Sequence, residues 1–375
     1  EVIGSGPADD AELDLANIVQ SAAKGVTTVQ EAPAIVTVVT ADEIASRGYL
    51  NLEQIIDGVP GWMRLGAEHS MFPFPLTRGM VQATLIMHNG LSLFEPFYNI
   101  PMVSRVQALE NIKRIEFITG PGGVLWGANS FLGVMNVITK DAEDVDGIEV
   151  GVSTADGNGD RQALRGYVMA GIPRLWSDDS KLFIHSSFES YRGAGFEMAS
   201  HLFSAPTPQP NSPMIYGPLT RAEPPRSLIF NLDGKLAVGP LSVYFQAPYA
   251  ERHAPLGFPG FVSREEWQED SLEIDGELAC PFEEPYLDTT DRCLDKGRRA
   301  RNNQEDFFDR YVVAEYRTRL AEGKAGLTLR GYGVQFSRRW PQLAVMAGVP
   351  QLLEGGLSLD DDASSYRIGA SADGD

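Results

Sequence analysis

The sequence predicts a mostly β protein, in which a small α+β domain is followed by antiparallel strands of a transmembrane β-barrel. Two observations support this fold class. After about Asp144, apolar and polar side chains alternate over segments of about ten residues, which is the period of a strand with one apolar face. The connections between these segments are alternately short and long, as in outer-membrane barrels with short turns at one rim and long loops at the other.

Composition and charge exclude several classes of protein. The 375 residues carry 31 basic and 51 acidic side chains, a formal net charge of −20. Because a nucleic-acid-binding protein needs a basic surface, we expect no nucleic-acid partner. No run of about 18 apolar residues occurs, which excludes a helical membrane protein but not a barrel, because barrel strands alternate.

The residues that most often carry chemistry do not form a recognisable site. The five histidines are scattered, and the sequence has no H-E-x-x-H, G-x-S-x-G or P-loop pattern, so we expect neither an enzyme nor a metal centre. Cys280 and Cys293 lie in a polar, acidic stretch without a nearby histidine. We expect a loop disulfide in an oxidising compartment, and a pair of free thiols in a cytoplasmic protein is the alternative.

The amino-terminal part divides into a leader and the α+β domain. Residues 1–25 are small, polar and acidic and are predicted to be a flexible leader. Residues 26–143 are predicted to form the domain, which begins with a β-branched strand over 34–40. Two helices follow, over 43–47 after a cap at Thr40–Asp42 and over 52–57 after a cap at Asn51. Further strands are predicted over 83–87, 114–118 and 134–138.

Residues 144–375 are predicted to hold the barrel strands. The expected strands are 147–155, 161–171, 181–192, 227–238, 241–249, 307–320, 325–338 and 364–372. Long loops follow the third, fifth and seventh strands, at about 194–226, 250–306 and 339–363, whereas the links after the second, fourth and sixth are short. The link after the first strand, DGNGD at 156–160, is the exception, because it is short where the pattern would place a long loop. Apolar and polar side chains also alternate along the strands of a soluble β-sandwich. A sandwich, however, has no physical reason to place its long loops at one end and its short turns at the other.

An ordered series of motifs spans the α+β domain. It comprises EAPAIVTVVTADEIASRGYLNLEQIIDGVPGW at 31–62, Arg78-Gly79, LIMHNGLSLFEPF at 85–97 and ENIKRIEFITGPGGVLWGANSFLGVMNVITK at 110–140. In this order the motifs resemble the plug domain of TonB-dependent outer-membrane receptors. The sequence departs from the family at Asn89, where the family carries an aspartate, and at Thr119, where it carries an arginine. We expect these changes to weaken the contact between plug and barrel while leaving it balanced in charge.

The resemblance implies a plugged barrel of about 22 strands in a Gram-negative outer membrane. The eight strands predicted here are about a third of such a wall, and an eight-stranded barrel is filled by its own side chains. We therefore expect either that the polypeptide continues beyond Asp375 or that a second chain completes the barrel.

The resemblance also implies a function and partners. The family admits a scarce, bulky solute, such as a ferric siderophore or a cobalamin-like complex, when a TonB-type periplasmic protein pulls on the plug. That protein pairs with a TonB box by strand addition. The positional candidate for the box is Asn17, Ile18, Val19 and Gln20, within ANIVQSA, and EVIGSG at 1–6 is the second choice. The alternative function is a receptor-like barrel that serves as a structural or assembly component without transport, and a soluble β-rich binding protein is a third.

The position of the loops in the family implies a ligand surface on the outward face of the plug. Its candidate residues offer aromatic area for stacking, with polar side chains beside it: His69, Phe72, Phe74, Phe94, Glu95, Phe97 and Tyr98. The alternative is that these aromatic side chains pack against barrel loops. Arg78, Arg114 and Glu116 are expected to anchor the plug against the inner wall. GPGG at 120–123 is interpreted as a tight turn and not a phosphate cradle, because no Lys-Ser/Thr follows it.

The remaining expected partners are lipids. Outer-membrane lipid and lipopolysaccharide would surround the barrel, and loop 250–306 is rich in acidic side chains. No resident cofactor is expected, and a bound lipid or divalent ion at this acidic surface is the alternative.

Overall fold

The computed structural model of the protein describes its regular elements and the turns between many of them. The described residues are 18–19, 27–28, 35–65, 74–80, 83–95, 100–101, 107–120, 126, 129–145, 147–156, 162–193, 196–197, 214–215, 221–222, 226–253, 262–263, 273–274, 277–278, 304–320, 325–342 and 361–374. The chain divides into two compact units, residues 1–65 with 73–145 and residues 66–72 with 146–375.

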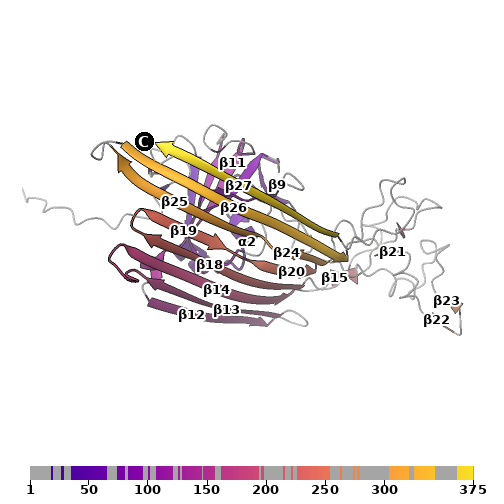
Figure 1. Ribbon diagram of the computed structural model, residues 1–375. Coiled ribbons are helices and arrows are strands. Elements are labelled where there is room, and N and C mark those ends of the chain that lie inside the picture. Colours follow the sequence, from indigo (N-terminus) through magenta and orange to yellow (C-terminus); the bar gives the residue numbers. More distant parts are fainter. Residues whose placement is uncertain are drawn as a thin grey trace, which may run out of the picture. The chain divides into compact units, whose positions relative to one another are not determined.

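A five-stranded mixed sheet forms the centre of the first unit (Figure 1). In order across the sheet its strands are β3 (Ile35–Thr40), β10 (Ile112–Thr119), β11 (Gly133–Thr139), β6 (Thr84–His88) and β7 (Leu91–Ser92). β10 runs antiparallel to β3 and β11, whereas β11 and β6 are parallel. The strands predicted in this region are confirmed, each to within about two residues.

The two predicted helices are also confirmed, as α1 (Ala41–Arg47) and α2 (Leu52–Asp57). Each is capped as its sequence indicates, because the amide of Glu43 donates to Thr40 Oγ1 at 3.2 Å and the amide of Gln54 donates to Asn51 Oδ1 at 3.0 Å. Gly48 ends α1 in the left-handed conformation, with φ 65°. A short α4 (Ala142–Val145) closes the unit.

Both faces of this sheet are buried. The main core joins the helices to one face and includes Ile55 and Ile56 of α2, Ile115 and Phe117 of β10, and Met135 of β11. A second cluster of Leu85, Met87, Ile118 and Val134 lies on the opposite face. Period-two alternation along β10 assigns its residues to these two faces.

Short antiparallel pairs complete the first unit. They are β1 (Ile18–Val19) with β2 (Thr27–Thr28), β4 (Trp62–Leu65) with β5 (Phe74–Thr77), and β8 (Phe94–Glu95) with β9 (Ile100–Pro101).

A ten-stranded antiparallel sheet makes up most of the second unit (Figure 1). Its strands are β12 (Gly147–Asp156), β13 (Gln162–Ile172), β14 (Ser180–Arg192), β18 (Arg226–Val238), β19 (Leu241–Gln246), β20 (Tyr249–His253), β24 (Gln304–Phe307), β25 (Arg310–Leu320), β26 (Ala325–Gln342) and β27 (Asp361–Gly374). Further two-residue pairs are β15 (Phe196–Glu197) with β17 (Arg221–Ala222), β16 (Met214–Ile215) with β21 (Val262–Ser263), and β22 (Glu273–Ile274) with β23 (Glu277–Leu278).

The ten strands form eight long ones, as the sequence predicts. β19 and β20 both pair with β18 in the same register, so together they are one long strand interrupted by two residues. β25 pairs with β19, and β24 pairs with β20 in that same register, so β24 and β25 are likewise one strand interrupted by two residues. The first interruption contains Pro248, which has no amide hydrogen for the ladder. The predicted fifth strand stops at 249, whereas the structure carries it on to His253.

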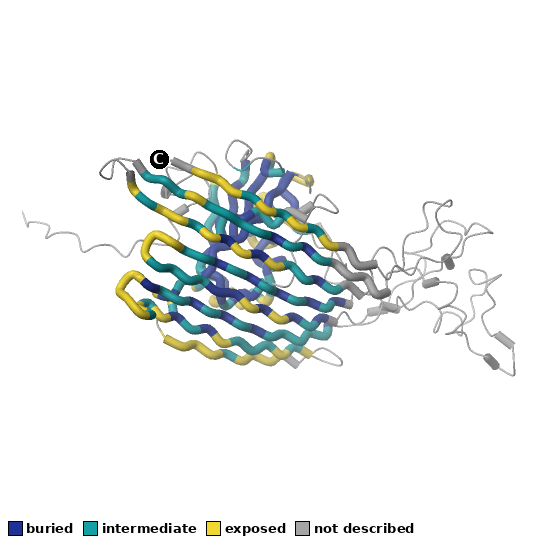
Figure 2. Tube along the Cα trace, in the orientation of Figure 1, coloured by how far each residue is buried: buried dark blue, intermediate teal, exposed yellow. Residues whose placement is uncertain are grey.

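The two faces of the large sheet differ in character. One face carries exposed aliphatic side chains, among them Val150 and Val152 of β12, which are 72% and 80% exposed, and Ile368 of β27, which is 87% exposed. Along most strands the opposite side chains are buried or half-buried, so exposure alternates residue by residue (Figure 2). This is the predicted alternation, and an exposed apolar face is what contact with hydrocarbon requires. Among the described residues, no helix is both long and apolar enough to cross a membrane.

Candidate functional site

The structure brings together the two hairpins that carry the predicted ligand loops. Phe74 begins β5, and Phe94 with Glu95 forms β8. β5 contacts β9, the partner strand of β8, and both hairpins contact β6 of the central sheet. His69, Phe72, Phe97 and Tyr98 lie outside the described residues. The strands of the two hairpins therefore lie beside one another, and a ligand surface formed by their loops stays a prediction.

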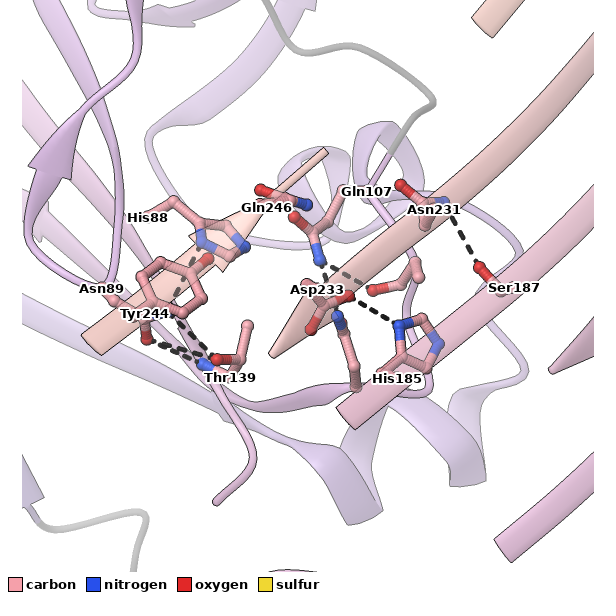
Figure 3. Close-up of polar contacts among 12 residues, drawn as sticks. His88, Asn89, Gln107, Thr139, His185, Ser187, Asn231, Asp233, Tyr244 and Gln246 are labelled. Atoms are coloured by element: carbon pink, nitrogen blue, oxygen red, sulfur yellow. Dashed lines mark hydrogen bonds and ion pairs between the residues drawn. The ribbon is translucent and has the colours of Figure 1, made fainter. Parts of the chain in front are cut away.

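Asn89 occupies a tight turn between β6 and β7, where the sequence departs from its resembled family. Asn89 and Gly90 have φ 48° and 76°, the left-handed pair that a two-residue hairpin with an Asn-Gly sequence adopts. Asn89 Nδ2 donates to Thr139 Oγ1 at 3.0 Å, and the Thr139 amide donates to Asn89 Oδ1 at 3.1 Å (Figure 3). The Gly90 amide donates to the buried Asn136 Oδ1 at 3.0 Å. Side-chain amides thus fix this turn to the end of β11.

Replacing Asn89 by aspartate is expected to change stability by less than about 0.5 kcal/mol, whereas Asn89→Ala should cost about 2–3 kcal/mol. An aspartate can accept from both the amide and the hydroxyl of Thr139, but alanine loses these bonds and is strained at φ 48°. Hydrogen exchange of the Thr139 amide in the full-length protein measures the change. Asn89→Gly is the matched control, because it removes the hydrogen bonds without the strain, and equal protection in all three variants would contradict the expectation.

The second departure from the family, Thr119, also makes a contact within its own unit. Trp62 Nε1 donates to Thr119 Oγ1 at 3.0 Å, and the indole packs edge-on against Phe117 with ring centroids 5.1 Å apart. Thr119 ends β10 and Trp62 begins β4, so this bond ties the hairpin of the first predicted ligand loop to the central sheet.

The predicted anchoring residues have two different environments. Arg114 and Glu116 are buried on the same face of β10, and Arg114 Nε lies 2.9 Å from Glu116 Oε1. Arg78 is exposed and has φ 49°, in a turn that joins Thr77 to Met80. Arg114 and Glu116 thus compensate each other's charge, and a contact of these residues with an inner wall stays a prediction.

A row of polar side chains crosses the buried face of the large sheet. His185 of β14, Asp233 of β18, Gln246 of β19 and Tyr311 of β25 are successive cross-strand partners. His185 Nδ1 lies 2.6 Å from Asp233 Oδ1, and both side chains are almost fully buried (Figure 3). Tyr311 donates to Gln246 Oε1, and Tyr244 Oη lies 2.6 Å from Tyr311 Oη. We call His185, Asp233, Gln246 and Tyr311 the polar row.

The polar row gives this face of the sheet hydrogen-bonding character, which extends beyond the row itself. On the next row, Asn231 Nδ2 donates to Ser187 Oγ at 3.3 Å (Figure 3). The alternation predicted from the sequence does not pair these residues, because pairing depends on the register between strands, and His185 and Asp233 lie 48 residues apart. The contact between His185 Nδ1 and Asp233 Oδ1 gives each of these buried side chains a polar partner.

Several further predicted sites fall wholly or partly outside the described residues. Ile18 and Val19 of the TonB-box candidate form β1, paired with Thr28 and Thr27, whereas Asn17 and Gln20 are not described. Cys280 and Cys293 also lie outside. Among the described residues, no group of three or more His, Cys, Asp or Glu side chains is arranged to hold a metal ion.

Comparison with known proteins identifies the first unit. The family model described as TonB-dependent Receptor Plug Domain matches residues 28–134. These residues are the plug domain of a TonB-dependent receptor. The family consists of receptors and transporters rather than enzymes. The plug domain and the sheet with an apolar outer face make the chain an outer-membrane protein of the Gram-negative type.

The chain matches curated relatives over part of their length. The chain is 28% identical over 149 residues to the pesticin receptor of Yersinia enterocolitica, covering 36% of this chain and 20% of that protein. It is 30% identical over 140 residues to the iron-regulated outer membrane virulence protein of Vibrio cholerae, covering 36% and 21%. The chain thus spans about a fifth of the length of the curated relatives it matches.

A solved receptor shares the fold. The ferric enterobactin receptor of Pseudomonas aeruginosa, in a mutant bound to enterobactin, aligns with a TM-score of 0.55 at 16% identity. The alignment covers 91% of this chain and 46% of that one, so both units have counterparts in a single receptor fold.

Proposed function

We propose that this chain is the plug and the first barrel strands of an outer-membrane receptor that takes up a ferric siderophore. The observation that carries the proposal is the plug domain at residues 28–134, followed in the same chain by eight long strands with an apolar outer face. A wide barrel has a water-filled lumen, and a plug makes passage through it conditional. Such a receptor binds its solute outside and releases it only when the plug is displaced.

A ferric solute is favoured over a cobalamin-like complex. The similar solved structure is a ferric enterobactin receptor, and the similar Vibrio cholerae protein is iron-regulated. The proposed contacts are the aromatic and polar residues of the two adjacent hairpin loops, which suit a bulky solute with aromatic groups. They are His69, Phe72, Phe74, Phe94, Glu95, Phe97 and Tyr98.

Energy for transport is proposed to come from a TonB-type periplasmic protein that pairs with Asn17–Gln20. Strand addition needs a short segment able to adopt an extended backbone. Ile18 and Val19 satisfy this requirement, since they already form a strand with Thr27 and Thr28. The same edge-to-edge hydrogen bonds are what a partner strand would use.

Deleting residues 1–25 is expected to reduce ferric siderophore uptake to the level of cells without the receptor, while assembly in the outer membrane stays intact. The deletion removes the segment on which the partner pulls but none of the described plug sheet or barrel strands. Uptake of radioactive iron by iron-starved cells, with a panel of ferric siderophores and cobalamin as alternative solutes, measures the effect. A deletion of residues 1–15 is the matched control, because it keeps Asn17–Gln20 and removes the second candidate box.

The outcomes separate the parts of the proposal. Unchanged uptake after deletion of residues 1–25 would reject the role of the leader in energy supply. Failure of the intact receptor to take up any ferric siderophore, together with uptake of cobalamin, would reject the assignment of the solute.

A further inference from the structure

One guanidinium stands on the exposed, apolar face of the large sheet. Arg310 opens β25 and is exposed, and period-two alternation puts it on the face of Val312, Ala314 and Tyr316. Among the described residues it contacts Phe308, whose ring centroid lies 3.4 Å from the guanidinium carbon. No carboxylate of the described chain pairs with it. An exposed cation on a lipid-facing wall, without a carboxylate partner in the described chain, is able to bind an anion from outside the protein.

The position of Arg310 along its strand marks the border of the apolar band. Toward the rim with the long connections, the same face continues with Phe308 and then Asp306, and in the other direction it is apolar as far as Tyr316. The ring of Tyr249 of β20 packs against Phe308 with centroids 6.1 Å apart, and aromatic side chains are typical of the membrane interface of a barrel. A lipid-facing arginine is unfavourable at the bilayer midplane and tolerated near the interface, where the lipid phosphates lie.

Further hydrogen-bonding groups lie beside Arg310 on the same face. Gln335 of β26 is its direct cross-strand partner, and Tyr366 of β27 is the partner of Gln335. Gln335 Nε2 donates to Tyr366 Oη at 3.3 Å, which leaves the proton of the Tyr366 hydroxyl free to be donated elsewhere. Tyr366 is 73% exposed. Arg310 and Tyr366 thus present donors across about two strand spacings, or roughly 10 Å, of open surface.

We propose that Arg310, Gln335 and Tyr366 bind a phosphate group of a lipid in the outer leaflet. The Phe308 ring supports the flat face of the guanidinium, so its N–H edge remains available for the paired hydrogen bonds that arginine makes to phosphate. The neighbouring carboxylate, Asp306, already has a partner of its own, so it does not neutralise Arg310. The proposal rests on the outer-membrane location and not on which solute the receptor transports.

Binding of a phosphorylated glycolipid to the detergent-solubilised, full-length receptor tests the site. Lipid A, the same lipid after removal of its phosphates, and inorganic phosphate are the three probes. We expect at least about tenfold tighter binding of the phosphorylated lipid than of the dephosphorylated one. Arg310→Gln should abolish this preference, and Arg310→Lys should retain part of it because the charge remains. Arg174→Gln is the matched control, since that side chain is 80% exposed in a turn at the opposite rim.

The possible results decide the proposal in either direction. Loss of the phosphate preference in Arg310→Gln but not in Arg174→Gln supports it. An unchanged preference in Arg310→Gln, or equal loss in both variants, overturns it. Competition by inorganic phosphate as strong as that by the lipid would show a site for free anions and also overturn it. Should Arg310→Gln fail to assemble, Tyr366→Phe removes a single hydroxyl, and a several-fold weaker preference is then the expected result.

Discussion

Replacing Glu116 by leucine is expected to lower the free energy of opening of the plug sheet by about 3–5 kcal/mol. Arg114 and Glu116 are 3% and 0% exposed, and the Nε–Oε1 distance of 2.9 Å makes them a buried ion pair. Removal of the carboxylate leaves the guanidinium charged and buried without compensation, which costs more than the pair contributes. Native-state hydrogen exchange of the β10 and β11 amides in the full-length protein measures this free energy.

The double variant Arg114→Met/Glu116→Leu is the matched control for this prediction. It removes both charges and keeps comparable side-chain volume, so it should recover most of the lost protection. Full recovery is not expected, because Glu116 has a polar partner besides Arg114. A loss of less than about 1 kcal/mol in Glu116→Leu would mean that the pair behaves like an exposed one and would contradict the burial argument.

Strand positions and faces in both units were predictable because they depend on local chain geometry. Phe230 and Leu232 alternate with Asn231 and Asp233 along β18, and a strand must place such neighbours on opposite faces. The structure confirms this, with the first two exposed and the last two buried. The cap of α2 at Asn51 is local in the same sense, since its partner, the Gln54 amide, lies three residues away.

Contacts between distant residues were not predictable, because they depend on strand register and turn geometry. From the sequence, Asn89 is interpreted as a lost charge, whereas the structure shows a left-handed turn residue bonded to Thr139, fifty residues away. The pairing of His185 with Asp233 is equally hidden, since many registers would place both residues on the polar face. Pro248 was visible in the sequence, but only the shared register of β19 and β20 shows that the strand continues beyond it.

For the candidate ligand site, the loops could be predicted from the sequence but the geometry of their contacts could not. The resemblance indicates which loops belong to the plug surface, and in the structure the strands of their hairpins are neighbours. The geometry of the solute contacts depends on loop conformation, for which neither alternation nor capping provides a rule. Thr119 instead bonds to Trp62 of the β4–β5 hairpin, and Asn89 fixes the β6–β7 turn to the end of β11.

Replacing Trp62 by alanine is expected to destabilise the plug sheet by about 3–5 kcal/mol. The indole is 5% exposed, packs against Phe117, and donates its Nε1 hydrogen to Thr119 Oγ1 at 3.0 Å. Alanine leaves a cavity in the main core and removes this bond. Trp62→Phe is the matched control, because it keeps most of the packing and should cost only about 1 kcal/mol for the lost hydrogen bond. Hydrogen exchange of the β10 amides reports both values.

Substitution of Gly133 tests whether the stability lost in Trp62→Ala comes from close packing around the indole. A Cβ on Gly133 would lie 2.9 Å from Trp62 Cζ2, 2.8 Å from Thr77 Cγ2 and 3.2 Å from the Ile118 carbonyl oxygen. Gly133→Ala should therefore cost about 1–3 kcal/mol in the native background. In the Trp62→Ala background it should cost at least about 0.5 kcal/mol less, because one of the three clashes is gone. Strictly additive costs would show that the indole is not in tight contact with β11, and that the stability of this hairpin has another source.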